Sequence, residues 1–199
     1  MSNDMIISNF EKFTKILLRC EERHGDFERF LEKYSDRILI TPGHDRSDRA
    51  SAMSGGMVAR CLSVLGHART LMTTSAFANC NFSMESIITV CLLFDIGRIG
   101  DEKGEYYIEQ TSQWHKEKGM LYTYNPNIRR MSQVHRGLYL LQREGIILSQ
   151  DEWIAILTHQ GPSSDENKFY INFEPKLAIL LQMAVKLAQM QDFQGTENN

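Results

Sequence analysis

The chain has 199 residues, of which 42% are hydrophobic and 24% are charged, and its formal net charge is −3. These values are typical of a soluble globular protein with one domain, and the length allows a core that needs no disulfide. The weakly negative charge excludes a global basic field that would attract nucleic acid, although a local basic patch stays open.

The four cysteines, Cys20, Cys61, Cys80 and Cys91, lack the close paired spacing of a zinc site. Cys61 and Cys91 lie in apolar helical patterns, so we expect reduced core residues. The polar first residues predict no signal peptide, and no apolar run approaches the roughly 20 residues of a membrane span. A cytoplasmic location without membrane association is therefore the expectation.

Helical periodicity dominates the start of the chain. Apolar residues from Ile6 to Leu18 recur every three or four positions, which predicts an amphipathic helix. Residues 24–26 interrupt that pattern, and Asp26 is expected to cap a second helix. Residues 41–54 are polar and contain Pro42, which predicts a loop. We therefore divide the chain into a helical appendage and linker, a main domain and a flexible tail, which are residues 1–48, 49–192 and 193–199.

Within the main domain, a long amphipathic helix is predicted from Met57 to about Ala78, and Ser83 is expected to open a second that runs to Asp95. Residues 97–127 are irregular and rich in glycine and aromatics, which is typical of a functional loop or lid. Two β-like runs in it, 106–108 and 121–124, could pair as a small hairpin. Three further helices are predicted at 131–143, 149–159 and from 174 through 187, so the predicted fold is all-α.

Several segments carry a resemblance to a known family. Residues 90–100 are VCLLFDIGRIG, and with a histidine in place of Phe94 this segment resembles the His-Asp signature of the HD superfamily of metal-dependent phosphohydrolases. Residues 54–64, SGGMVARCLSV, resemble the glycine-rich helix that opens many HD domains. Residues 134–141, 153–161 and 174–178 resemble HD-domain proteins of bacteriophages and, more distantly, bacterial 3′–5′ exoribonucleases. The resemblance covers residues 50–190 and implies an HD-type bundle of about five core helices.

The resemblance implies a first metal site that this chain has largely lost. HD proteins hold that ion with a histidine of the opening helix, the His-Asp doublet and an aspartate of the last helix. The corresponding positions here are Arg60, Phe94, Asp95 and Val185, so Asp95 alone is retained. One carboxylate cannot hold a catalytic divalent ion, because the ion demands several ligands. We expect no metal at this first site.

A second set of family ligands is better preserved. Asp95, His135 and His159 match it, whereas Gln160 stands where a second histidine or an aspartate is usual. These four residues are the candidate catalytic group. One divalent ion, of Mn, Fe, Mg or Zn, could be held by Asp95, His135 and His159. In the family such ions polarise a phosphoryl oxygen and generate hydroxide.

A physical hypothesis follows for the lost site. Arg60 comes from the same helix face as the missing histidine, so its guanidinium could lie against Asp95 and supply the charge of the metal. Phe94 and Val185 would then fill the vacated space as core. Simpler interpretations stay open: Asp95 could be a helix-terminal acid, His135 a cap, and His159 a partner of helix-end carbonyls.

Further side chains are weaker candidates for ligand contacts. Arg98 and Arg136 could bind phosphate, but for Arg98 a solvated or acid-paired side chain is an equally good explanation. Four arginines could form a basic face for phosphates and four tyrosines could stack on a base, but both sets have structural alternatives, in solvation and in packing of the lid. The basic face comprises Arg129, Arg130, Arg136 and Arg143, and the rings are Tyr106, Tyr107, Tyr122 and Tyr124.

The sequence therefore favours a catalytically degenerate HD-domain protein, phage-encoded by resemblance and then acting in the host cytoplasm. It would bind a protein partner or a nucleotide as a regulatory module, and nucleic acid is not indicated by the net charge. The alternative is an active metal-dependent phosphohydrolase on nucleotides or nucleic-acid ends that uses Asp95, His135 and His159. A third reading is a virion or assembly component that reuses the fold as a scaffold.

Overall fold

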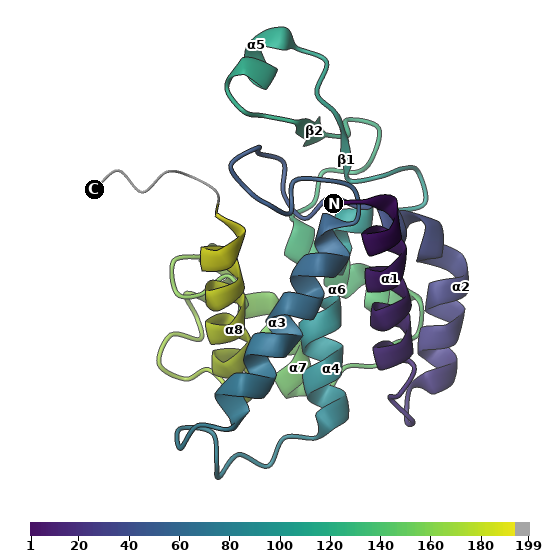
Figure 1. Ribbon diagram of the computed structural model, residues 1–199. Coiled ribbons are helices and arrows are strands. Elements are labelled where there is room, and N and C mark those ends of the chain that lie inside the picture. Colours follow the sequence, from purple (N-terminus) through teal and green to yellow (C-terminus); the bar gives the residue numbers. More distant parts are fainter. Residues whose placement is uncertain (194–199) are drawn as a thin grey trace.

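Helices make up most of the chain in the computed structural model, which describes residues 1–193 (Figure 1). Eight α-helices and one two-stranded sheet occur in this part of the chain, which confirms the all-α prediction. Within residues 1–193, no helix combines the length and the apolar character needed to cross a membrane. The predicted tail, 193–199, lies outside the described residues except for Phe193.

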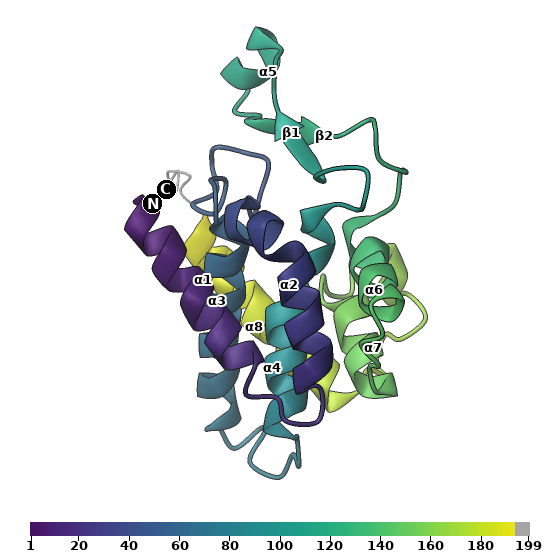
Figure 2. The same cartoon turned by 90° about the vertical axis from the view of Figure 1, so that its right-hand side faces the viewer.

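The two N-terminal helices, α1 (Asn3–Leu17) and α2 (His24–Ile40), lie side by side (Figure 2). The prediction that Asp26 caps α2 is wrong, because His24 and Gly25 are already helical. Asp26 lies in the first turn instead, where a negative charge interacts favourably with the helix dipole. Phe13 and Phe27 are fully buried and belong to the same core cluster as the residues of the main bundle.

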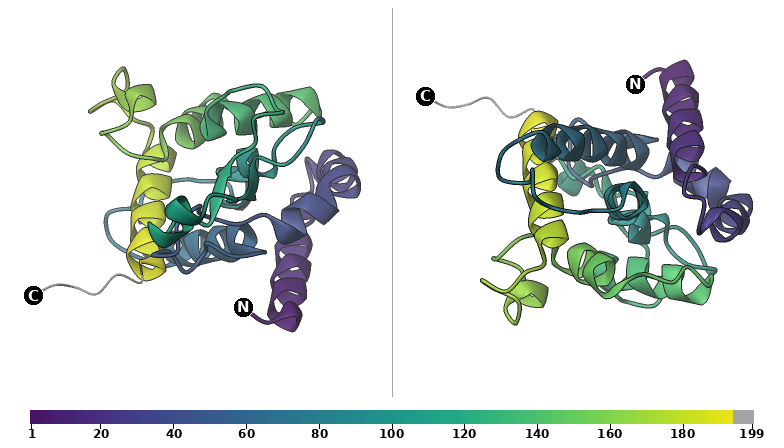
Figure 3. Two further views of the ribbon diagram at one scale, coloured as in Figure 1. Left: turned by 90° about the horizontal axis from the view of Figure 1, so that it is seen from above. Right: turned by 90° about the horizontal axis from the view of Figure 1, so that it is seen from below.

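The centre of the bundle is α4 (Met84–Leu93), which is opened by Ser83 as predicted. Every residue from Ile87 to Leu93 is buried, because α3 (Gly56–Met72), α7 (Gln150–Thr158), α8 (Lys176–Asp192) and α1 all contact α4. Figure 3 shows this central position from below. The helix expected to reach Ala78 ends at Met72, since the hydroxyls of Thr73 and Thr74 bond back to the carbonyls of its last turn.

The irregular segment contains the predicted hairpin. Strands β1 (Tyr107–Glu109) and β2 (Tyr122–Tyr124) pair antiparallel, with Tyr107 opposite Tyr124. A short helix that the sequence did not predict, α5 (Gln113–Glu117), lies between them. The hairpin and α5 project beyond the end of the bundle (Figures 1 and 2). A 3₁₀ turn, η1 (Ile96–Ile99), joins α4 to this segment.

The last three helices begin and end close to their predicted positions. They are α6 (Gln133–Arg143), α7 and α8, and a second 3₁₀ turn, η2 (Asp165–Asn167), lies between α7 and α8. The start of α7 is a capping box, in which Ser149 accepts from the amide of Glu152 and Glu152 accepts from the amide of Ser149. α8 packs against α3 and α7, and α6 packs against η1. Residues of α3, η1, α6 and α8 therefore meet at one end of the bundle.

Candidate functional site

Asp95 is fully buried at the junction between α4 and η1, where three donors surround its carboxylate. Arg60 donates from Nη1 to Oδ2 at 2.8 Å, and Arg98 donates from Nε to Oδ1 at 2.8 Å. The side-chain amide of Gln133 also donates to Oδ1. The hypothesis that Arg60 pairs with Asp95 is therefore confirmed. Arg98 is a further partner, in line with the acid-paired alternative given for it, and Gln133 is one that the sequence did not predict.

The two arginines determine the charge state of Asp95. Burial acts to raise the pKa of Asp95, but Arg60 and Arg98 outweigh that effect and hold the pKa below its ordinary value. The side chains of Arg60 and Arg98 are only 7% and 10% exposed. A buried carboxylate without partners would cost several kcal/mol, so the arginines are a condition for Asp95 to be charged here. Two cations and one anion leave a net positive charge.

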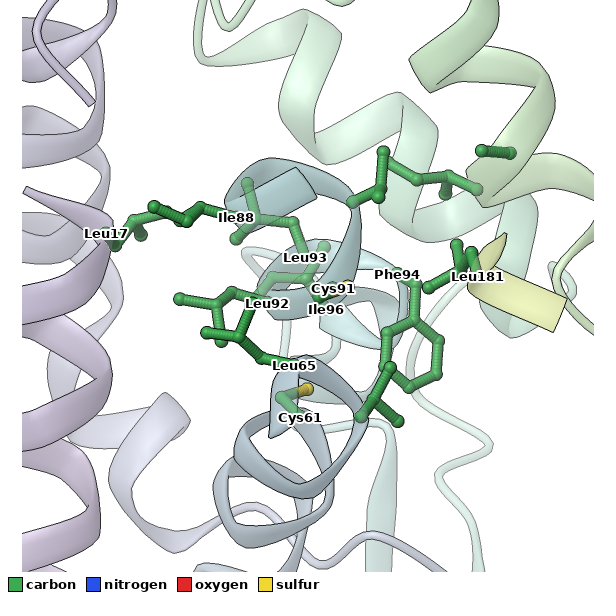
Figure 4. Packing of buried hydrophobic residues seen from close by; sticks show 14 of the residues in the cluster. Leu17, Cys61, Leu65, Ile88, Cys91, Leu92, Leu93, Phe94, Ile96 and Leu181 are labelled. Atoms are coloured by element: carbon green, nitrogen blue, oxygen red, sulfur yellow. The ribbon is translucent and has the colours of Figure 1, made fainter. Parts of the chain in front are cut away.

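Apolar side chains fill the space beside this cluster, as predicted. Phe94 is fully buried and Val185 is 2% exposed. Figure 4 shows the ring of Phe94 between Cys61 of α3 and Leu181 of α8. The guanidinium carbon of Arg60 lies 5.5 Å from the centroid of that ring, in cation–π geometry. Arg60, Phe94, Asp95 and Val185, which the family resemblance singled out, are thus part of the core or of the ion cluster.

His159 lies at the end of α7, in contact with the same cluster. Its Nδ1 is 2.7 Å from the carbonyl oxygen of Ile156, so Nδ1 carries the proton and Nε2 has a free lone pair. Burial lowers the pKa of His159 to about 4, although Asp95 opposes the shift. The ring packs edge-on against Phe94, with centroids 4.9 Å apart. The imidazole is therefore neutral near pH 7, and it satisfies a helix-end carbonyl as the simpler interpretation expected.

His135 has a different environment. Its side chain is 54% exposed, and its Nδ1 lies 2.8 Å from the hydroxyl of Ser132, the N-cap of α6. Among residues 1–193 no group of three or more His, Cys, Asp or Glu side chains could hold a metal ion. The structure thus brings His159 to Asp95 but leaves His135 at the surface. With both oxygens of Asp95 taken by its partners, these residues do not fit a divalent ion in the present arrangement.

The two arginines considered for phosphate binding are both paired with acids. Besides Asp95, Arg98 contacts the hydroxyl of Tyr107 at 2.8 Å, which ties the hairpin to the cluster. Arg136 is 2% exposed and donates to Asp101 at 2.7 Å and to the hydroxyl of Tyr124 at 3.2 Å. Arg136 is therefore enclosed and holds the hairpin onto α6, whereas Arg98 also borders a cavity.

That cavity, of about 580 Å³, opens directly over the Asp95 cluster. Arg60, Arg98, Gln133 and His159 border it from the cluster side. Lys186 lies on its wall and forms no ion pair within the described part of the chain. We call this cavity the Asp95 pocket, and the other lining residues are His44, Arg49, Gln160, Gln189, Met190, Asp192 and Phe193.

Sequence reasoning identified Gln160 as part of this region but missed Lys186 and Arg49. Lys186 directly follows Val185, which the family resemblance singled out, so its place in the chain was an available signal. Arg49 comes from the loop before α3 and reaches the pocket because that loop is fastened to the end of α8. The amide of Ala50 donates to the carbonyl oxygen of Asp192 at 2.7 Å, and the guanidinium of Arg49 stacks 4.8 Å from the ring of Phe193.

Comparisons of the chain with protein families, with curated proteins and with solved structures found no match.

Proposed function

We propose that this chain is a degenerate HD-type domain that binds a phosphorylated small molecule of the nucleotide class in the Asp95 pocket, without hydrolysing it. The observation that carries the proposal is the excess of cations around a cavity of suitable size. Ligand pockets for small molecules usually span about 300–1,000 Å³, and the Asp95 pocket has about 580 Å³.

The charge excess has an identifiable origin. Asp95 neutralises only one of the two guanidiniums that flank it, and Lys186 is a further cation among the residues that line the pocket. Asp192 is the one acid among the lining residues, and its carboxylate already accepts hydrogen bonds from the amide and hydroxyl of Ser51. A phosphate group would thus meet donors that are fixed in place before it arrives, which favours binding.

The same geometry argues against catalysis. General-base catalysis works best when the pKa of the base lies near the working pH. Asp95 is saturated by its three donors, and the pKa of His159 is about 4, so neither side chain is suited to activate water near pH 7. Within the proposal, Arg60 and Arg98 take the electrostatic role of the ions that HD proteins use, but they cannot generate hydroxide.

One observation favours the alternative of an active metal-dependent phosphohydrolase. A histidine that donates Nδ1–H to a backbone carbonyl and presents Nε2 is held in the manner of many metal ligands, and His159 has this arrangement. That function would require Asp95 to release its arginines and His135 to approach. No particular contact favours the third possibility, a virion or assembly scaffold.

Calorimetric titration with adenosine diphosphate tests the proposal. We expect binding in the presence of a chelator and no release of phosphate. Lys186→Gln should weaken binding about tenfold, because it removes one charge-assisted contact. Lys176→Gln is the matched control, since Lys176 is an exposed lysine of the same helix that does not line the pocket. Absence of binding would overturn the proposal. Manganese-dependent hydrolysis that His159→Gln abolishes would establish the alternative, because this variant can keep the hydrogen bond to the carbonyl of Ile156.

A further inference from the structure

A second cavity, of about 650 Å³, lies between the hairpin and the start of α6. It is lined by Tyr106, Tyr124, Arg130, Met131 and Ser132, and it shares no residue with the Asp95 pocket. Figure 2 shows the chain descending from the projecting hairpin into α6 at this place. We call it the hairpin pocket. It combines aromatic rings, a thioether and a cation in one concave surface.

The aromatic wall of the hairpin pocket is fixed by contacts behind it. The rings of Tyr106 and Tyr124 meet edge to face, with centroids 5.2 Å apart. The hydroxyl of Tyr124 donates to the carbonyl oxygen of Arg129 at 2.7 Å and accepts from the buried Arg136. Both tyrosines are half-buried, so part of each ring faces the cavity. A wall that is rigid before binding loses little side-chain entropy when a ligand stacks on it.

The charge of the hairpin pocket is positive and uncompensated. Arg130 is exposed and, like its neighbour Arg129, has no acidic partner among residues 1–193, whereas Arg136 pairs with Asp101. Ser132 is the N-cap of α6, an 11-residue helix whose first amides point toward this end. A helix N-terminus favours anions, and here it is reinforced by the side chain of Arg130.

We propose that the hairpin pocket binds one nucleotide unit of a single-stranded nucleic acid, with the base against Tyr106 and Met131 and its phosphate at Arg130. Base stacking on aromatic side chains together with backbone contacts to arginine is how proteins bind single strands without reading their sequence. The proposed unit needs an unpaired base, so a duplex should bind poorly. This site is separate from the Asp95 pocket and does not depend on the function proposed for it.

Fluorescence anisotropy with a labelled single-stranded DNA of about 12 nucleotides tests the site. Arg130→Gln should weaken binding about tenfold. It should also make the slope of log K against log salt concentration less steep by about one, which corresponds to the loss of one phosphate contact. Tyr106→Leu should weaken it by a similar factor, whereas Tyr106→Phe, which keeps the ring, should bind like the wild type. Arg19→Gln, a change of an exposed arginine in the turn after α1, is the control and should have no effect.

Four results would decide the matter. Equal affinity of the wild type and Arg130→Gln, or equal binding of a duplex of the same sequence, would overturn the proposal. Loss of binding on Lys186→Gln but not on Arg130→Gln would also overturn it and place the strand in the Asp95 pocket. Displacement of the strand by excess adenosine monophosphate, unchanged in Lys186→Gln, would support the base-and-phosphate site in the hairpin pocket.

Discussion

Two ion clusters in this protein, one buried and one partly exposed, have opposite compositions. In one, Arg23 lies between two acids, with Nε 2.8 Å from Glu85 and the two terminal nitrogens 2.8 and 2.9 Å from Glu152. In the other, Asp95 lies between Arg60 and Arg98. The first cluster has an excess of one negative charge and borders none of the cavities described above. The second has an excess of one positive charge and borders the Asp95 pocket.

The difference separates a structural ion cluster from a candidate binding site. Arg23 links the start of α2 to α4 and α7, and its two acidic partners come from helices that pack together. Its acids serve the fold, because Glu152 also caps α7. The Asp95 cluster likewise joins elements, but its unneutralised charge faces a cavity. Burial and ion pairing alone therefore do not indicate function; an unbalanced charge beside an open space is the more specific sign.

The largest effect is expected for Asp95→Asn. The change leaves Arg60 and Arg98 buried without a counter-charge, so we expect the free energy of unfolding to fall by about 3–5 kcal/mol. Urea denaturation measures it. Asp36→Asn is the control, because Asp36 is exposed on α2 and forms no ion pair within the described residues. A loss below about 1 kcal/mol would show that the arginines do not depend on Asp95.

A smaller loss, about 2–3 kcal/mol at pH 7, is expected for Arg23→Met, because its cluster is partly exposed. This loss should shrink in acid. Burial acts to raise the pKa of Glu152, but the hydrogen bond from Arg23 outweighs it and lowers the pKa. The stability from this pair is present above the unfolded pKa of glutamate, near 4.3, and disappears as the pH falls below it.

Urea denaturation at pH 7 and again near pH 3.5 measures that difference between the wild type and Arg23→Met. Arg23→Lys keeps the charge but not the forked geometry and should lie between them. A deficit that is the same at both pH values would mean that Arg23 acts through packing rather than through its acids.

Part of the Asp95 cluster could be predicted from the sequence, because it depends on local register. Arg60 lies on the inner face of α3, at a position where the family that the sequence resembles has a histidine, and that face points inward whatever side chain it carries. Arg98 follows Asp95 by three residues in a 3₁₀ turn, which is a local relation that the sequence also contains. Gln133 is 38 residues from Asp95, and its contact depends on how α6 packs against η1. No local pattern reveals such a contact.

His135 shows the reverse case, in which the local pattern of the sequence was a better guide than the family resemblance. Its match to a family ligand favoured the interior, but the periodicity of α6 favours the surface. Val134, Leu138 and Leu141 are buried, and His135 and Tyr139 lie on the exposed side of the same helix. The helical pattern was visible in the sequence and was the better guide. The fold class and the last three helices were likewise predicted from helical periodicity, and the hairpin from two short β-like runs.

The smallest of these stability effects concerns His159, whose neutral form keeps the charge of the Asp95 cluster at one positive unit. The folded pKa of about 4 lies below the ordinary 6.5, so the unfolded chain binds the proton more readily. The resulting stability is complete above pH 6.5 and is lost as the pH falls toward 4. We expect a loss of roughly 1.5 kcal/mol between pH 7 and pH 5 from this group.

Urea denaturation across that range checks it, with His159→Gln as the variant, because an amide can still donate to the carbonyl of Ile156. The variant should lose the pH dependence, while His135→Gln, at an exposed histidine, should retain it. If His159→Gln has the same slope as the wild type, His159 is charged in the folded protein. The cluster would then carry two positive charges at pH 5, and phosphate should bind to it more tightly in acid than at pH 7.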